Sequence, residues 1–206
     1  PGDQIICDKW SHIHLYEAGG ASANSGVNFN LLDGNRGMIT ADQVKDGIND
    51  PEFYHVPLSK MVGIENTTNK GGGACYDIAE LQKIKQVCQD HNLKYHLDGA
   101  RIWNALIAKK QQPKQFGQLF DTISVCFSKG LGAPIGSVLI SDAETIHRAL
   151  RIRKIFGGNL RQSGYLAAAG IYALQNNINR LEEDHRRAKE LGKKKKKCSW
   201  VAIVEP

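Results

Sequence analysis

Two charged segments of the sequence follow apolar runs in positions where side chains could do chemistry. Asp98 comes directly after Tyr95–Leu97, and Arg101 follows three residues later. Lys129 comes just after the apolar run Ile123–Phe127, in a turn rich in glycine. The ends of parallel strands lie at one edge of an α/β sheet, where ligands bind. We therefore expect these charges to emerge together.

A lysine beside an aspartate suggests chemistry on a bound aldehyde. A lysine amine held in a partly dry cleft loses its proton more easily and can attack an aldehyde to form a Schiff base. Pyridoxal 5'-phosphate is such an aldehyde, and it withdraws electrons well only if a carboxylate keeps its ring nitrogen protonated. Asp98 is placed for that role, and Arg101 for holding the ring hydroxyl or an amino-acid carboxylate.

Each segment taken alone has a plainer interpretation. An aspartate after a strand is commonly a helix N-cap, and a lysine after a strand is commonly a solvated loop residue. The combination is more specific because both segments continue into a longer pattern.

That pattern resembles the low-specificity L-threonine aldolase family of pyridoxal-phosphate enzymes. The similarity covers about residues 1 to 191. The two signature segments of the family are similar to residues 96–105 and 128–137, and three further segments are similar at residues 8–17, 64–67 and 154–162.

The resemblance implies a fold, a cofactor and a reaction. The fold is α/β, the large domain of the type I pyridoxal-phosphate-dependent transferase-like class, with a mainly parallel sheet flanked by helices. The reaction is cleavage of L-threonine or L-allo-threonine to glycine and acetaldehyde. Lys129 would carry the cofactor, Asp98 would pair with its ring nitrogen, and Arg101 would bind its hydroxyl or the substrate carboxylate.

Further residues take roles from the same resemblance. His12 would stack over the cofactor ring, and Lys154 and Arg161 would lie near the cofactor phosphate. His12 and His55 are both candidates for handling the proton of the substrate hydroxyl, because imidazole titrates near neutral pH. The sequence does not favour one of these two histidines over the other. We expect His14, which faces away from His12 in an extended segment, to lie on the surface.

The sequence departs from the family pattern in several places. Thr68 stands where histidine is common, and Asn159-Leu160 replaces the usual Gly-Met. A phosphate-binding turn expected upstream is missing, as is a small C-terminal domain expected beyond Leu191. We therefore predict a cofactor-binding domain over 1–191 that lacks its N-terminal part, and a basic, disordered or altered tail over 192–206.

Alternating apolar runs and helical patterns would position these residues. Strands are predicted at 5–7, 27–32, 61–64, 95–97, 123–127 and 135–140, several of them apolar at consecutive positions, as buried parallel strands are. Helices are predicted after Thr40, with Gln43 completing a capping box, and from Asp77, with Glu80, to about His91. From Ser141 the pattern is helical to Leu191, with a break at Gly157-Gly158.

Composition excludes several classes of protein. Five of the charges behind the net charge of +6 are the consecutive lysines 193–197, so a basic balance is confined to a tail. The five cysteines are scattered without a C-x-x-C pair, which indicates neither a disulfide framework nor a zinc site. A reducing, cytoplasmic location fits this use of cysteine. No apolar run approaches the length of a membrane helix.

Three alternatives stay open at this stage. A β-eliminating lyase of the same fold would use the same lysine and aspartate, and an inactive fragment would lack the phosphate-binding turn. A nucleic-acid-binding module is disfavoured because aromatic residues are not interleaved with basic ones. We expect an amino-acid substrate, a homo-oligomer, specifically a tetramer, and neither nucleic acid nor membrane as partner.

Overall fold

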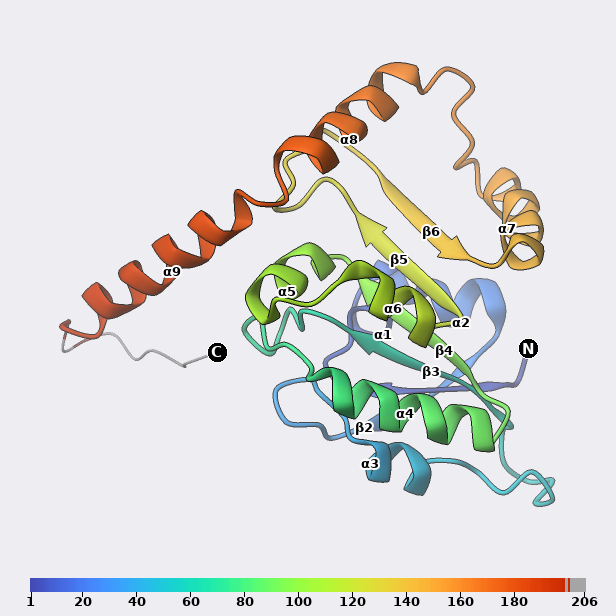
Figure 1. The fold of residues 1–206 in the computed structure, drawn as a ribbon. Coiled ribbons are helices and arrows are strands. Elements are labelled where there is room, and N and C mark those ends of the chain that lie inside the picture. The colour runs from blue at the N-terminus through green and yellow to red at the C-terminus, as the bar shows by residue number, and fades with distance from the viewer. Residues whose placement is uncertain (199, 201–206) are drawn as a thin grey trace.

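The computed structural model describes residues 1–198 and 200 of the chain. Its helices and strands alternate along the sequence before three helices close the described part (Figure 1). In chain order the elements are β1 (Gln4–Asp8), α1 (His12–Leu15), the 3₁₀ turn η1 (Glu17–Gly19), α2 (Gly20–Ser25), β2 (Asn28–Leu32), α3 (Ala41–Asp46), β3 (Ser59–Glu65), α4 (Ile78–Asp90), β4 (Lys94–Gly99), α5 (Ile102–Lys109), α6 (Pro113–Leu119), β5 (Thr122–Cys126), β6 (Ser137–Ser141), α7 (Ala143–Ile155), α8 (Gly164–Asn176) and α9 (Leu181–Lys195).

The strands form one six-stranded sheet in the order β2-β1-β3-β4-β5-β6. Each pairing is parallel except that of β5 with β6, which is antiparallel. All the predicted strands are present, and the predicted α/β class with a mainly parallel sheet flanked by helices is confirmed. The five parallel strands therefore end at one edge of the sheet.

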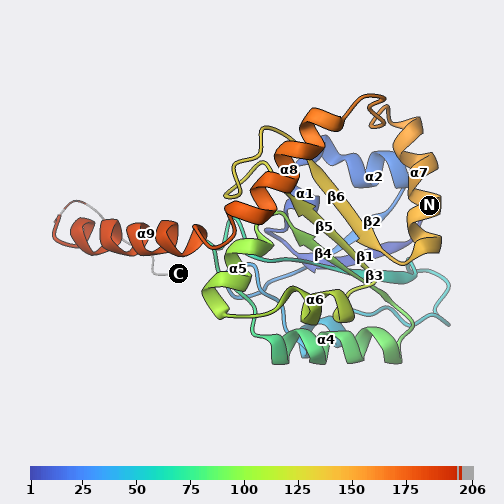
Figure 2. The ribbon, with the colours of Figure 1, turned by 45° about the horizontal axis from the view of Figure 1, so that its top comes forward.

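Helices cover both faces of this sheet. Figure 2 shows α4 and α6 on one face and α2, α7 and α8 on the other, with α9 projecting away, and Figure 1 shows α3 beside α4. The first face carries the main core, in which Tyr95 and Leu97 of β4 pack with Leu81 and Ile84 of α4. Successive strand side chains alternate between faces, so Asp98 points to the opposite face from this core.

The two predicted helix caps have different outcomes. The Thr40 side chain accepts a hydrogen bond from the Gln43 backbone N–H, and the Gln43 side chain accepts one from the Thr40 backbone N–H, so the capping box of α3 is confirmed. The predicted cap of α4 is wrong in its chemistry, because Asp77 makes no capping hydrogen bond. Its carboxylate pairs with Lys109 at 2.8 Å, and Glu80 accepts from the Ala41 backbone N–H at 2.8 Å instead.

The C-terminal helices follow the predicted pattern, with α7 ending just before the Gly157-Gly158 break. The predicted boundary at residue 191 lies inside α9, which continues through three of the five lysines to Lys195. Residues 199 and 201–206 of the predicted tail lie outside the described residues. Across residues 1–198 and 200, no helix combines the length and apolar character needed to cross a membrane.

Candidate active site

The strand ends bring two acidic residues side by side. Glu65 at the end of β3 is in register with Asp98 near the end of β4, and Asp98 is in register with Ser124 of β5. The Asn66 backbone N–H donates to the Asp98 carbonyl at 3.0 Å, which extends the pairing past the strand end. The carboxylates therefore lie at the edge where β5 also ends.

The Asp98 carboxylate is half-buried, and among the described residues only one of its two oxygens accepts a hydrogen bond. Its Oδ1 accepts one hydrogen bond, from the Ala100 backbone N–H at 3.1 Å. Helix α5 begins only at Ile102 with Arg101 at its N-cap position, so Asp98 is not the helix cap of the plainer interpretation. In the described part of the chain no donor binds its second oxygen, which leaves that atom available to a ligand.

Lys129 lies in the tight turn that follows β5. Its side chain is exposed and, within residues 1–198 and 200, makes neither a hydrogen bond nor an ion pair. The Gly132 backbone N–H donates to the Lys129 carbonyl at 2.9 Å, and Gly132 has a φ of 72°, which favours glycine. The glycine-rich turn predicted from the sequence therefore presents a free amine.

Cys126, the last residue of β5, lies close enough to several charged side chains for them to affect the pKa of its thiol. Burial raises the pKa of its thiol. The positive charges of Lys129 and Arg101 act against this rise in pKa, and the negative charges of Asp98 and Glu17 act with it. Three of the residues predicted to bind the cofactor, Asp98, Arg101 and Lys129, therefore lie together near the end of β5.

Helix α1 carries His12 to the same edge. A Cβ on Gly63 of β3 would lie 3.0 Å from Ile13 Cδ1, so the glycine allows α1 to pack directly onto the sheet. The His12 backbone N–H donates to Glu65 Oε2 at 3.3 Å, and its ring Nδ1 lies 3.4 Å from Glu17 Oε1. His12 is therefore held above the ends of β3 and β4.

Glu65 is a functional candidate that the sequence reasoning quoted but gave no role. It is 4% exposed and also accepts a hydrogen bond from the Asn69 backbone N–H at 3.0 Å. Burial raises the pKa of its carboxyl group. Its position at the end of an apolar strand is the signal that singled out Asp98, and the same signal could have found Glu65. Cys126 offered no such signal.

The expectation for His14 was partly wrong. Residues 12–15 form a helical turn rather than an extended segment, so His14 does not simply face away from His12. Its ring is half-buried and contacts Phe29 edge-on, with 5.1 Å between centroids.

Three predicted site residues lie elsewhere in the described chain. His55 is exposed in the loop before β3, at the opposite edge of the sheet, where its ring packs on Tyr54 with 4.0 Å between centroids. Lys154 lies near the end of α7, and Arg161 lies in the connection to α8. Both are exposed, and within residues 1–198 and 200 neither side chain makes a hydrogen bond or ion pair.

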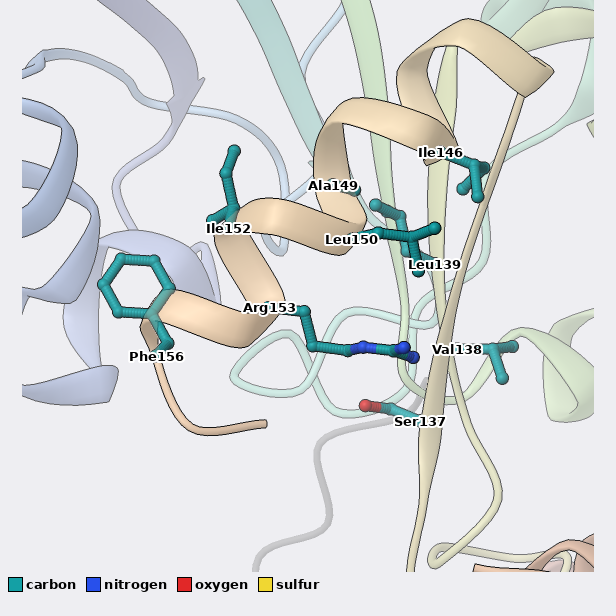
Figure 3. Close-up of a pocket in the computed structure, with 9 residues that line it drawn as sticks. All are labelled: Ser137, Val138, Leu139, Ile146, Ala149, Leu150, Ile152, Arg153 and Phe156. Carbon is teal, nitrogen blue, oxygen red and sulfur yellow. The ribbon is translucent and has the colours of Figure 1, made fainter. Parts of the chain in front are cut away.

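A separate cavity of about 520 Å³ lies between α7 and β6 (Figure 3). Apolar side chains form most of its wall, and the Arg153 side chain extends across it toward Ser137. None of the predicted site residues lines it. It is a space beside the outermost strand and not the predicted cofactor site.

The site matches, by residue type, the cofactor expected from the sequence. That cofactor presents an aldehyde, a ring nitrogen and a ring hydroxyl. The free amine of Lys129, the available oxygen of Asp98 and the guanidinium of Arg101 suit these three groups respectively. The residues present therefore fit it.

Comparison with known proteins decides the family. The profile of the beta-eliminating lyase family matches residues 1–206. The chain belongs to the beta-eliminating lyase family. Among curated members of similar sequence, a low-specificity L-threonine aldolase of Escherichia coli K12 is 40% identical over 188 residues, which is 91% of this chain and 55% of the relative. The low-specificity L-threonine aldolase 1 of Arabidopsis thaliana is 37% identical over 194 residues, 92% of this chain and 54% of the relative.

Solved structures agree on the fold of this beta-eliminating lyase family member. The threonine aldolase of Leishmania major superposes with a TM-score of 0.83 at 22% identity, covering all of this chain and 60% of that protein. The chain spans about half the length of the curated relatives it matches.

Proposed function

We propose that this chain forms most of the cofactor-binding domain of a lyase that cleaves L-threonine or L-allo-threonine to glycine and acetaldehyde. The observation that carries the proposal is the gathering of Asp98, Arg101 and Lys129 around Cys126, at the sheet edge where β4 and β5 end. The named relatives, two of them low-specificity L-threonine aldolases, support the substrate.

The proposed cofactor is pyridoxal 5'-phosphate, which when bound supplies an electron sink for breaking a bond at the substrate α-carbon. Lys129 would hold the cofactor at its aldehyde group. Asp98 would accept a hydrogen bond from its ring nitrogen, and Arg101 would bind its hydroxyl or the substrate carboxylate. Lys154 and Arg161 are proposed to bind its phosphate. These two roles stay predictions, because both side chains are exposed and, within residues 1–198 and 200, neither makes a hydrogen bond or an ion pair.

The proton of the substrate hydroxyl is assigned to His12. Cleavage of the carbon–carbon bond requires a base for that proton, and imidazole is suited to the role near neutral pH. His12 is supported over His55 because its backbone binds Glu65, the register partner of Asp98, whereas His55 lies at the far edge of the sheet. Glu17 lies beside its ring, with Oε1 3.4 Å from Nδ1.

The wider biological setting is also a proposal. We propose a cytoplasmic homotetramer that acts in threonine breakdown and glycine formation and binds neither nucleic acid nor membrane. The names of the relatives support the metabolic role, and the use of cysteine supports the compartment.

The test is covalent trapping of the cofactor on the chain as given. Incubation with pyridoxal 5'-phosphate and reduction with borohydride should leave a label confined to Lys129, located by peptide mass spectrometry. Lys129→Arg, which keeps the charge but lacks a reactive amine, should lose that label, whereas Lys154→Arg should retain it. A label spread over the surface lysines of the unaltered chain would refute the proposal.

A β-eliminating activity is the second candidate, and the family profile is the observation that favours it. The two reactions release different products. Acetaldehyde and glycine from threonine indicate the aldolase, whereas pyruvate and ammonia from an amino acid with a β-leaving group indicate the eliminase. Labelling at Lys129 without either product would support the third alternative, an inactive fragment.

A further inference from the structure

The turn that carries Lys129 is held from the outside by the junction between α8 and α9. The Asn177 side chain donates to the Leu131 carbonyl at 2.7 Å, and the Arg180 guanidinium donates to the Gly130 carbonyl at 3.0 Å. Both acceptors lie within two residues of Lys129 along the backbone. The donors come from a part of the chain more than forty residues away.

Packing reinforces these hydrogen bonds. Leu131 is 1% exposed and Leu181, the first residue of α9, is 0% exposed, and both belong to a small second core separate from the main one. A Cβ on Gly130 would lie 2.8 Å from Leu181 Cδ2 and 3.2 Å from Asn104 Oδ1. A larger residue at position 130 would therefore require the Leu181 side chain to shift for the turn to pack against α5 and α9.

The inner side of the turn is fixed by β5, which ends three residues before Lys129. The Ala133 backbone N–H donates to the Phe127 carbonyl at 3.1 Å, closing the base of the turn. Without the side chains of Asn177 and Arg180, the carbonyls at its tip would have no partner shown by the described chain. The direction in which the exposed Lys129 amine leaves the turn is therefore set from both sides.

We propose that Asn177 and Arg180 are positioning residues that hold the Lys129 turn so that its amine can meet the cofactor aldehyde. The proposal rests on the function proposed above. It gives α8 and α9, which carry none of the predicted site residues, a part in the site. A small misplacement of a reacting group lowers rates steeply, so loss of either donor should slow attachment of the cofactor.

The test compares matched substitutions. Asn177→Asp keeps the shape of the side chain but cannot donate from a carboxylate, and Asn176→Asp is its control, because Asn176 donates only to the Tyr172 carbonyl on the exposed side of α8. Arg180→Met removes the donor, and Arg180→Lys retains one. Arg187→Met is the second control, because Arg187 pairs with Glu183 on α9.

Two measurements are made on each chain. The first is hydrogen exchange of the backbone amides at 130–133 in the cofactor-free chain. The second is the rate at which borohydride traps pyridoxal phosphate on Lys129. For Asn177→Asp we expect exchange at 130–133 to rise and trapping to slow, each by about tenfold, the scale of one lost hydrogen bond. Arg180→Met should behave similarly, and Arg180→Lys should recover most of the loss.

The outcomes separate the possible failures. Trapping and exchange within about twofold of the Asn176→Asp control would overturn the inference. A general loss of stability would instead raise exchange in β1 to β4 as well. In that case, recovery of exchange at 130–133 and of trapping in Arg180→Lys would support the inference, and no recovery would overturn it. If the unaltered chain is not labelled at Lys129, the proposed function fails, while the exchange comparison on the cofactor-free chain still tests whether Asn177 and Arg180 hold the turn.

Discussion

His12 and His14 show how two residues of one type, two positions apart, acquire different surroundings. His12 contacts Tyr16 and Glu17 above the strand ends, whereas His14 packs on Phe29 of β2. The difference arises from a single helical turn, which points the two rings in different directions.

This difference predicts unequal losses of activity. His12→Asn should lower acetaldehyde release from threonine by about 100-fold or more, the usual scale for removing a general base, because His12 is the histidine that is hydrogen-bonded to Glu65 at this sheet edge. His14→Asn is the matched control and should leave the rate close to that of the unaltered chain. Steady-state release of acetaldehyde measures both. A large loss in His55→Asn together with normal activity in His12→Asn would contradict the assignment.

His96 predicts a pH dependence of stability. It is half-buried within the sheet, with its Nδ1 2.7 Å from Thr122 Oγ1. Burial lowers the pKa of its imidazole, with Asp98 acting in the opposite direction. The unfolded chain then binds more protons than the folded chain just below the ordinary histidine pKa of about 6.5. His96 therefore contributes stability above that pH that is lost as the pH falls toward the lower, folded-state pKa.

Urea unfolding between about pH 7.5 and pH 5 tests this sign, the range spanning the ordinary histidine pKa. The free energy of unfolding should fall on acidification, with a share from His96 of at most about 1.4 kcal/mol per pH unit. His96→Gln should flatten that fall. His91→Gln, at the exposed end of α4, should leave it unchanged, and a steeper fall in His96→Gln would show that the sign is wrong.

The N-caps of two helices show that the same sequence pattern can lead to two different structures. Thr40 and Asp77 precede α3 and α4 with the same spacing to a Gln or Glu. Only Thr40 caps, because Glu80 is drawn to the Ala41 backbone and Asp77 to Lys109. A partner from elsewhere in the chain can therefore take a residue away from its local role.

The two residues should respond differently to replacement by alanine. Thr40→Ala should lower the free energy of unfolding by about 1 kcal/mol, the usual worth of an N-cap. Asp77→Ala removes only an exposed ion pair and should cost well under about 1 kcal/mol. Urea unfolding measures both, and an equal or larger loss in Asp77→Ala would mean that it caps α4 in solution.

At the scale of the whole molecule, the side of the sheet beyond β5 is the least covered. The apolar residues Val138, Leu139 and Ile140 of β6 are consecutive and all exposed, as are Ile155 and Phe156 at the end of α7. Consecutive apolar residues in a strand are typical of burial on both faces. An exposed apolar surface of this kind often marks an interaction site.

We therefore predict that the chain self-associates through the surface formed by β6 and α7. Light scattering should give a mass above that of a single chain. Ile155→Glu, which places a charge where the side chain is 78% exposed, should lower that mass. Leu191→Glu, at a 55% exposed position on α9, is the control and should not. A monomeric unaltered chain would contradict the prediction.

The local sequence pattern specifies the alternation of helices and strands and the sheet edge at which the charged residues lie. Apolar runs specify buried strands locally, and parallel strands end at one edge of a sheet. The sequence therefore predicts that Asp98 and Lys129 lie at the same edge. The same rule could have identified Glu65, which also lies at the end of a predicted strand.

The partners of these residues depend on how distant parts of the chain pack together. Three features depend on contacts between segments that are far apart in the chain. They are the antiparallel direction of β6, the separation of His55 from the strand ends, and the hydrogen bonds from Asn177 and Arg180 to the Lys129 turn. Local patterns encode which residues are buried, but not which distant donor reaches a given carbonyl. Those pairings are settled when the helices pack around the sheet.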